Sequence, residues 1–292
     1  MPTFPRRRAK NGAPPVAKAP KLSRFSKFAR QPVDGEAPRR RGIYLLPNAF
    51  TTAALFCGFY AIVMAMNQKF EHAAWAIFIA MILDGLDGRI ARLTNTQSEF
   101  GAQYDSLSDM VSFGAAPALV IYEWSLRGLG KLGWIAAFVY CAGAALRLAR
   151  FNTNIEVVDK RFFQGLPSPA AAAMVAGFIL MMVDLGVAGV QSPVVSWVSW
   201  GIALFAGLTM VTNVPFYSFK DVNFRKSVPF IAVFLIALGL ALLSIDPPKV
   251  LLPIFMIYGI SGYAVYFWRL SKGTSVSIIQ TDHEPLDQSE RR

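Results

Sequence analysis

The sequence predicts an all-α polytopic membrane protein with about eight transmembrane helices. Three observations support this fold class. The 292 residues are 54% hydrophobic and only 16% charged. The mean hydropathy of +0.41 is too high for a water-soluble domain of this size. The 22 Gly and 18 Pro are residues that transmembrane helices tolerate better than soluble helices do. A large soluble catalytic domain is therefore excluded.

Apolar runs long enough to span a bilayer occur eight times along the chain. They lie at residues 45–66, 73–93, 103–125, 132–151, 166–187, 193–212, 227–245 and 249–270. An even number of spans puts both termini on one side of the membrane. All Lys and Arg fall on that side except Lys69, Arg127, Lys131 and Lys249. The positive-inside rule therefore predicts a multi-pass protein of the cell membrane with cytoplasmic N- and C-termini.

The two ends of the chain are polar and differ in charge from the spans. Residues 1–42 contain 12 Lys and Arg but only two acids, which indicates a disordered cytoplasmic arm. Anionic membrane lipids are its expected partner, and nucleic acid is not. Leu22, Phe25 and Phe28 recur at helical spacing, which favours a short interfacial helix, although a solvated tail is the alternative. Residues 273–292 are expected to form a disordered cytoplasmic tail.

Four carboxylates mark the cytoplasmic ends of the second and third expected helices. They are Asp84, Asp87, Asp105 and Asp109. The first two stand three residues apart and share a helix face with the small residues Gly88 and Ala91. The last two stand four residues apart, in line with Gly101. Because a short connection joins the two helices, the two acidic faces are expected to oppose each other.

Four converging carboxylates beside a membrane need cations, because like charges repel and desolvation disfavours each of them. Ligands that are all oxygen favour Mg²⁺ or Mn²⁺, with Ca²⁺ as a further option, and such ions commonly bridge carboxylates to phosphates. The site therefore suits a diphosphate. Gly88, Ala91 and Gly101 would let a nucleotide approach the backbone, and Arg92 supplies a cation. The alternative is that the acids are merely solvated, or paired with Arg89 and Arg92.

The acids belong to a longer pattern of fixed letters at fixed gaps. It reads Asp84-x2-Asp87-Gly88-x2-Ala91-Arg92-x8-Gly101-x3-Asp105-x3-Asp109. This pattern resembles, letter for letter, the signature of the CDP-alcohol phosphatidyltransferase family. The resemblance implies a homodimeric enzyme that uses divalent metal in a membrane-embedded cavity to displace CMP from a CDP-linked lipid with an alcohol. It also implies a six-helix catalytic core over residues 43–213, with two additional transmembrane helices over residues 214–272.

Four further segments are similar to the phosphatidylserine synthase branch of that family, which implies L-serine as the acceptor. They are Val111 to Pro117, Leu146 to Asn152, Phe163 to Ala170 and Pro215 to Lys220. The segment from Leu46 to Thr51 resembles the part of the first helix that lies beside the nucleotide. The expected contacts of CDP-diacylglycerol are then Asn48, Thr51, Asp84, Gly88, Ala91, Arg92 and Gly101.

The serine contacts expected on this reading are Ser112, Phe113, Arg147, Arg150 and Lys220. A serine carboxylate needs a cation, and the three basic residues map to the cytoplasmic face. Positive-inside topology explains these cations equally well. Ser168 lies between two prolines with no His nearby, so it is expected to start a helix and not to act as a nucleophile.

Asp109 is the expected general base for the serine hydroxyl, because it is the last acid and lies close to Ser112. It is also counted among the metal ligands, and the sequence does not separate the two roles. Two alternatives stay open. The acceptor could instead be glycerol 3-phosphate, inositol phosphate or choline, which would need a tighter basic cluster or an aromatic cage. Outside this chemistry, membrane acids also mark cation-coupled transporters.

Overall fold

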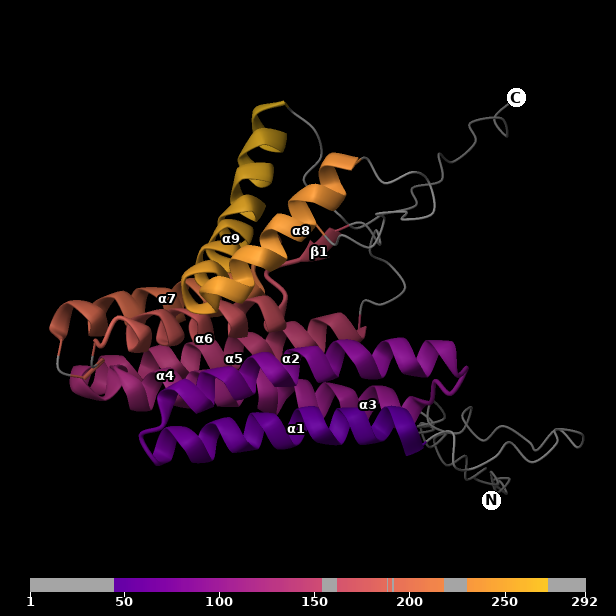
Figure 1. The fold of residues 1–292 in the computed structure, drawn as a ribbon, viewed down its shortest axis with the longest axis horizontal. Helices are drawn as coiled ribbons and strands as arrows, with labels where there is room; N and C mark the ends of the chain where they lie inside the picture. Colours follow the sequence, from indigo (N-terminus) through magenta and orange to yellow (C-terminus); the bar gives the residue numbers. More distant parts are fainter. Residues whose placement is uncertain (1–44, 154–161, 188, 191, 218–229, 273–292) are drawn as a thin grey trace, which may run out of the picture. The chain divides into compact units, whose positions relative to one another are not determined.

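The computed structural model describes residues 45–153, 162–187, 189–190, 192–217 and 230–272. These residues form a bundle of α-helices joined mostly by short connections (Figure 1). The N-terminal arm with its expected interfacial helix, Lys220 and the tail at 273–292 all lie outside the described residues. The assignments made for them stay predictions.

The helices follow the expected spans closely. They are α1 (Leu45–Met66), α2 (Phe70–Leu93), α3 (Glu99–Asp109), α4 (Ala116–Trp124), α5 (Lys131–Thr153), α6 (Ser168–Asp184), α7 (Pro193–Val211), α8 (Phe230–Ile245) and α9 (Pro247–Ser271). Two short segments are wound differently from an α-helix: Met110–Ala115 is a wider π-helix, and Leu126–Leu129 is a tighter 3-10 helix. The all-α class is confirmed.

The third span differs from the single helix expected at residues 103–125. It begins earlier, at Glu99, because the Ser98 side chain caps the helix by accepting a hydrogen bond from the Gly101 amide at 3.0 Å. The segment Met110–Ala115 then widens into a π-helix between α3 and α4. Neighbouring helices hold this wide turn, since the Ser112 hydroxyl donates to the Ala54 carbonyl at 3.1 Å and the Tyr140 hydroxyl donates to the Phe113 carbonyl at 3.0 Å.

A short two-stranded ribbon was not expected. Strand β1 (Phe162–Gln164) pairs antiparallel with β2 (Pro215–Tyr217), with Phe163 opposite Phe216. The ribbon joins the chain just before α6 to the chain just after α7. It therefore fixes the entry to α6 beside the exit from α7, and it leaves the fold class unchanged because each strand has only three residues.

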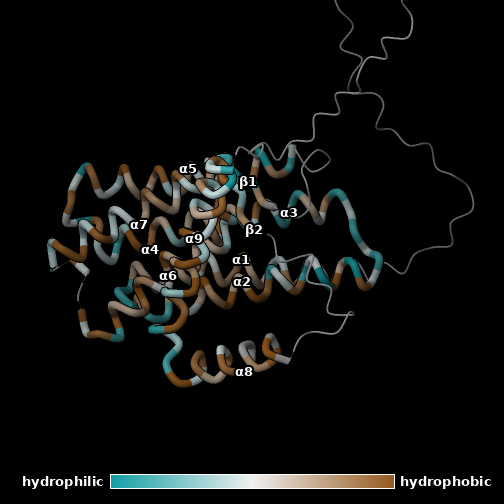
Figure 2. Tube along the Cα trace, turned by 90° about the horizontal axis from the view of Figure 1, so that it is seen from above, coloured by the Kyte–Doolittle hydropathy of each residue, from teal (hydrophilic) through white to brown (hydrophobic). Residues whose placement is uncertain are grey.

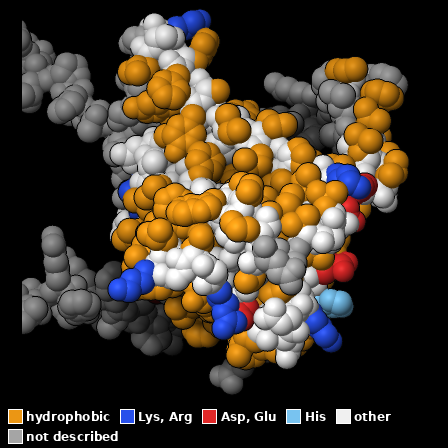
Figure 3. All heavy atoms as spheres, turned by 90° about the vertical axis from the view of Figure 1, so that its left-hand side faces the viewer, with side chains coloured by type: hydrophobic (Ala, Val, Ile, Leu, Met, Phe, Trp, Pro, Cys, Tyr) orange, Lys and Arg blue, Asp and Glu red, His pale blue; other side chains and the backbone are white. Residues whose placement is uncertain are grey.

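Within the part of the chain that the structure describes, four helices are long and apolar enough to cross a membrane by length and composition, namely α1, α5, α7 and α9. Helix α2 has the length but contains charged residues in its second half, and α6 and α8 are shorter, at 17 and 16 residues. Hydrophobic side chains cover most of the face drawn in Figure 3, as the surface of a membrane protein requires. The number of eight spans stays a prediction.

The core of the bundle is centred on α6, whose residues from Ala170 to Leu180 are all buried. Helices α2 and α9 both pack against α6, and α9 approaches it closely at Gly177. Helix α1 packs along α2, and α5 packs against α7, where Gly207 lies so close to Tyr140 that a methyl group there would be 2.8 Å from the Tyr140 Cα. Small residues at helix contacts are the usual means of close packing in membranes.

Candidate active site

Three carboxylates from two helices converge at one end of the bundle. Asp84 on α2 and Asp105 and Asp109 on α3 each offer an oxygen, and these oxygens lie within 4.8 Å of one another. The chain reverses between the two helices at Asn95, which has a φ of 51°, a left-handed value that Asn tolerates. Figure 2 shows hydrophilic positions gathered at the end of α2 and the start of α3. The expected opposition of the two acidic faces is thus present for these three residues.

Two of these carboxylates have buried oxygens without hydrogen-bond partners, Asp105 Oδ1 and Asp109 Oδ1. A buried carboxylate oxygen that lacks a partner is costly, and a bound cation removes the cost. Among the described residues, neither Arg89 nor Arg92 forms an ion pair with the acids, and both side chains are exposed. A set of oxygen donors with free lone pairs therefore fits a hard divalent cation.

Asp87 has a different environment from the other three acids. Its side chain is only 5% exposed, and its Oδ2 accepts a hydrogen bond of 2.7 Å from the Thr51 hydroxyl on α1. It lies outside the group of three carboxylates. A role for Asp87 as a metal ligand stays a prediction, whereas its hydrogen bond joins α1 to α2.

The residues expected to contact the nucleotide lie around this end of α1, α2 and α3. A methyl group added at Gly88 would meet nothing within 4 Å, so open space adjoins the backbone next to Asp87. A methyl group at Gly101 would lie 3.6 Å from Asn48 Oδ1, which places Asn48 on α1 beside the start of α3. Ala91 is half-buried, and Arg92 is exposed in the last turn of α2. Their contacts with a nucleotide stay predictions.

Arg147 on α5 brings a cation to the edge of the acidic group. Its guanidinium interacts electrostatically with Asp109, and its Nη1 donates a hydrogen bond of 2.8 Å to the Ser168 hydroxyl. Its Nε is buried without a partner. Ser168 begins α6, as expected, but its hydrogen bond to Arg147 was not predicted from the sequence. The only sign of Ser168 in the sequence was its place in the Pro-Ser-Pro turn, which predicts a helix start and not a hydrogen bond to Arg147.

The other expected serine contacts within the described residues are Ser112, Phe113 and Arg150, and their contact with serine stays a prediction. Ser112 and Phe113 are buried in the π-helical segment, where the Ser112 hydroxyl bonds to the Ala54 carbonyl. Arg150 donates to Asn213 Oδ1 at 3.1 Å and so joins α5 to the chain after α7. Of the basic residues expected at the serine and described by the structure, Arg147 is the one that interacts electrostatically with Asp109.

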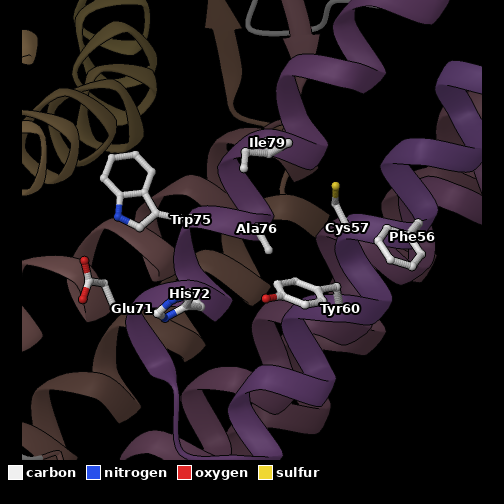
Figure 4. Close-up of a pocket in the computed structure, with 8 residues that line it drawn as sticks. All are labelled: Phe56, Cys57, Tyr60, Glu71, His72, Trp75, Ala76 and Ile79. Carbon is white, nitrogen blue, oxygen red and sulfur yellow. The ribbon is translucent and has the colours of Figure 1, made fainter.

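A cavity of about 400 Å³ lies between α1 and α2, away from the three carboxylates (Figure 4). Phe56 and Tyr60 of α1 and Trp75 of α2 line it, together with Glu71 and His72 near the start of α2. The three converging acids are absent from its lining. Its walls are mainly apolar and lie nearer the loop that joins α1 to α2, so it is distinct from the acidic group.

Comparison with known proteins shows which family the chain belongs to. Residues 44–212 match the model of the CDP-alcohol phosphatidyltransferase family. The CDP-diacylglycerol–serine O-phosphatidyltransferase of Helicobacter pylori is 35% identical over 218 residues, which cover 75% of this chain and 90% of that protein. The enzymes of the same name from Methanocaldococcus jannaschii and Saccharomyces cerevisiae are 34% and 31% identical, over 65% and 66% of this chain and 82% and 67% of theirs. The chain therefore belongs to the CDP-alcohol phosphatidyltransferase family.

Proposed function

We propose that this protein transfers the phosphatidyl group of CDP-diacylglycerol to the hydroxyl of L-serine, forming phosphatidylserine and releasing CMP. The observation that carries the proposal is the convergence of Asp84, Asp105 and Asp109, in which Asp105 and Asp109 each have a buried oxygen without a hydrogen-bond partner. A diphosphate held through divalent cations is the substrate feature that such a site suits. The relatives named for serine transfer, which match over most of this chain, support serine as the acceptor.

The nucleotide end of the substrate lies, in this proposal, beside α1 and the motif glycines. Open space at Gly88 lets the diphosphate approach the α2 backbone; Thr51 of α1 is bonded to the neighbouring Asp87, and Asn48 of α1 lies beside Gly101. Arg92 is exposed at the end of α2, where it can pair with a phosphate. When bound to the acids, Mg²⁺ or Mn²⁺, or alternatively Ca²⁺, would offset the charge of the diphosphate and of the departing CMP.

The chemistry is a substitution at phosphorus. The serine oxygen forms a bond to the lipid-side phosphorus, the bond from that phosphorus to the bridging oxygen breaks, and CMP leaves with that oxygen. An alcohol is a weak nucleophile, so a base must accept its proton as the new bond forms. Asp109 is the proposed base, because it belongs to the group of three acids and is the one that interacts electrostatically with Arg147. Arg147 would then pair with the serine carboxylate.

The proposal extends to placement in the cell. Both termini and the acidic group would lie on the cytoplasmic side of the cell membrane, with the basic arm on anionic lipids and two copies forming a homodimer. The strong bias of Lys and Arg toward one side of the predicted spans supports this orientation. The arm's charge supports its attraction to anionic headgroups.

A panel of acceptor alcohols tests the proposed function. The purified enzyme in detergent micelles with CDP-diacylglycerol and Mn²⁺ is given L-serine, glycerol 3-phosphate, inositol phosphate or choline, and CMP and lipid product are measured. We expect that, of the four alcohols, only serine gives CMP and lipid product, and that CMP and phosphatidylserine form in equal amounts. Asp105→Asn should remove most of this activity, whereas Asp184→Asn, which changes an acid at the far end of α6, should keep it. CMP release without an alcohol, or preference for another alcohol, would contradict the serine assignment.

A further inference from the structure

Two hydrogen bonds fix how α5 lies against the segment that carries the acids Asp105 and Asp109. The Tyr140 hydroxyl donates to the Phe113 carbonyl at 3.0 Å, and the Asn152 amide donates to the Ser106 hydroxyl at 3.0 Å. Residue numbers rise along α5 as they fall along the other segment, so the two run antiparallel. A side chain between the two contacts on α5 therefore faces the part of α3 between them.

Arg147 and Asp109 occupy matching positions in this register. Asp109 stands three residues after Ser106 and four before Phe113, so the three share one stripe of their segment. Arg147 stands seven residues after Tyr140 and so lies on its stripe of α5. The hydrogen bonds therefore place Arg147 opposite Asp109, and the electrostatic interaction between the two side chains agrees with this.

Ser168, the first residue of α6, is the hydrogen-bond partner of Arg147. Its side chain is fully buried, and its hydroxyl accepts from Arg147 Nη1 at 2.8 Å. The chain just before it is anchored to the end of α7, since the Leu166 amide donates to the Thr209 carbonyl at 3.2 Å. The prolines on either side restrict its backbone further. The hydroxyl is thus a fixed acceptor for one end of the guanidinium.

The other edge of the guanidinium is left for a ligand. Among the described residues, the Arg147 Nε has no hydrogen-bond partner, although it is buried. A buried donor without a partner is costly, so its presence opposite the acids indicates an acceptor group that the protein does not supply. The edge that carries Nε can receive both oxygens of a carboxylate when the guanidinium plane is held in one orientation.

We propose that Ser168 is a positioning residue for the acceptor: its buried hydroxyl holds one end of the Arg147 guanidinium, so that the Nε edge stays available to the carboxylate of the incoming amino acid. The Pro-Ser-Pro turn, which the sequence predicted only as a helix start, then also sets the geometry of the acceptor site. This inference rests on the proposed function, because it assumes an acceptor with an anionic group.

The test compares two buried serines. Ser168→Ala removes the acceptor for Arg147, and Ser125→Ala removes an equally buried hydroxyl that donates to Ser199 at 2.8 Å, at the end of α4 far from the acids. Both full-length enzymes are assayed for Tm, kcat and the KM of serine and of CDP-diacylglycerol. We expect Ser168→Ala to raise the KM of serine about tenfold, the effect of losing one hydrogen bond to a charged group, with the KM of CDP-diacylglycerol unchanged. Ser125→Ala should change neither KM.

Ser168→Cys provides a second variant of nearly the same size, which keeps the packing if Ser168→Ala does not fold. Sulfur is a weak acceptor, so this variant should also raise the KM of serine while its Tm stays close to that of the wild type. In an Arg147→Lys background, Ser168→Ala should lower kcat/KM for serine much less than in the wild type, because lysine has no planar fork to orient.

Three results would overturn the proposal. They are an unchanged KM of serine in Ser168→Ala and Ser168→Cys, equal effects of Ser168→Ala and Ser125→Ala, and full additivity of Ser168→Ala with Arg147→Lys. A fall in kcat with an unchanged KM of serine belongs to the first of these, and it would show that Arg147 serves Asp109 and not the acceptor.

Failure of the proposed function is distinguishable from failure of this inference. If the wild-type enzyme uses another anionic alcohol, the serine assignment fails, and the same variants read against the KM of that alcohol still decide the role of Ser168. If the wild-type enzyme uses only an alcohol without an anionic group, the role given to Ser168 is overturned as well.

Discussion

Asp84 and Asp87 lie one turn apart on the same helix face, yet their surroundings differ. Asp84 meets Asp105 and Asp109, whereas Asp87 accepts a hydrogen bond from Thr51 of α1. The sequence alone does not separate them, and the difference comes from their neighbours, which are Thr51 of α1 for Asp87 and the two acids of α3 for Asp84. A hydrogen bond to a charged group contributes about 1.5–3 kcal/mol, and Thr51 offsets part of the cost of burying Asp87. The two acids are thus expected to differ in their contributions to metal affinity and to stability.

Asp109 is the residue whose two possible roles can be separated by one substitution. If it is the base, Asp109→Asn should abolish transfer while the affinities for CDP-diacylglycerol and for metal stay within about tenfold of the parent, because a base acts mainly in the transition state. Binding of both ligands to the purified variant in nanodiscs checks this. Loss of metal or nucleotide affinity together with the rate would instead identify a ligand. Near-normal turnover with serine would exclude both roles.

At the scale of the helix, the third span is the element on which the site depends most. Its α-helical start holds Asp105 and Asp109, and its π-helical segment begins at the next residue. The segment is held from two sides, by Ala54 of α1 through Ser112 and by Tyr140 of α5 through Phe113. A wide turn directly after Asp109 sets the direction of that carboxylate relative to α4, as π-turns commonly do at functional sites.

The contact of α1 with this segment predicts a pair of glycine variants with opposite effects. A methyl group at Gly58 would lie 2.6 Å from Ser112 Oγ and 2.7 Å from its Cα, so Gly58→Ala should force α1 away and cost about 1–3 kcal/mol. Gly201→Ala on α7 meets nothing within 4 Å, and should be neutral or stabilising by up to about 1 kcal/mol. Thermal unfolding of both variants in the same detergent, with turnover measured in parallel, checks this. Equal shifts in Tm would contradict the packing described for the π-segment.

The sequence predicted those elements whose signal is local. The bounds of α1, α2, α5 and α7 agree with the apolar runs to within a few residues, because length and hydropathy determine them. The π-turn, the β1–β2 ribbon and the hydrogen bond from Arg147 to Ser168 were missed. Each depends on partners far along the chain, such as Tyr140 for the π-turn, and no periodicity within one segment reports such partners. The convergence of the acids on α2 and α3 could be predicted, because spacings of three and four residues place the acids of each helix on one face.

For the whole molecule, the site is assembled from helices distant in the sequence. Helices α2 and α3 give the acids, α1 borders the nucleotide space, and α5 gives Arg147. The central helix α6 contacts α2 and α9, and the hydroxyl of its first residue, Ser168, accepts a hydrogen bond from Arg147. A substitution that disturbs the packing on α6 is therefore expected to weaken the binding of both the metal and the acceptor. A substitution in only one of these two parts of the site should weaken the binding of one substrate.

The N-terminal arm gives a prediction at the same scale. Deleting residues 1–40 should leave turnover largely intact, because none of the converging acids lies in the arm, but should weaken binding to anionic surfaces. Each basic residue near such a surface contributes about 1 kcal/mol, and the contribution falls with salt. Cosedimentation of the enzyme with anionic and with neutral vesicles, at low and high salt, measures the change. A folded deletion variant without activity would show instead that the arm helps to build the site.

The central claim is that Asp84, Asp105 and Asp109 together hold the divalent cation on which transfer depends. Its most direct test is Mn²⁺ binding to the purified enzyme, followed by electron paramagnetic resonance, for the wild type, Asp84→Asn and Asp105→Asn, with Asp184→Asn as the control acid. We predict saturable Mn²⁺ binding to the wild type and the control, and an Mn²⁺ affinity at least about tenfold lower in the two site variants. Each Asp→Asn substitution removes a charged oxygen ligand while it keeps the shape of the side chain. Equal Mn²⁺ affinity in all four proteins, or no binding to the wild type with CDP-diacylglycerol present, would contradict the account.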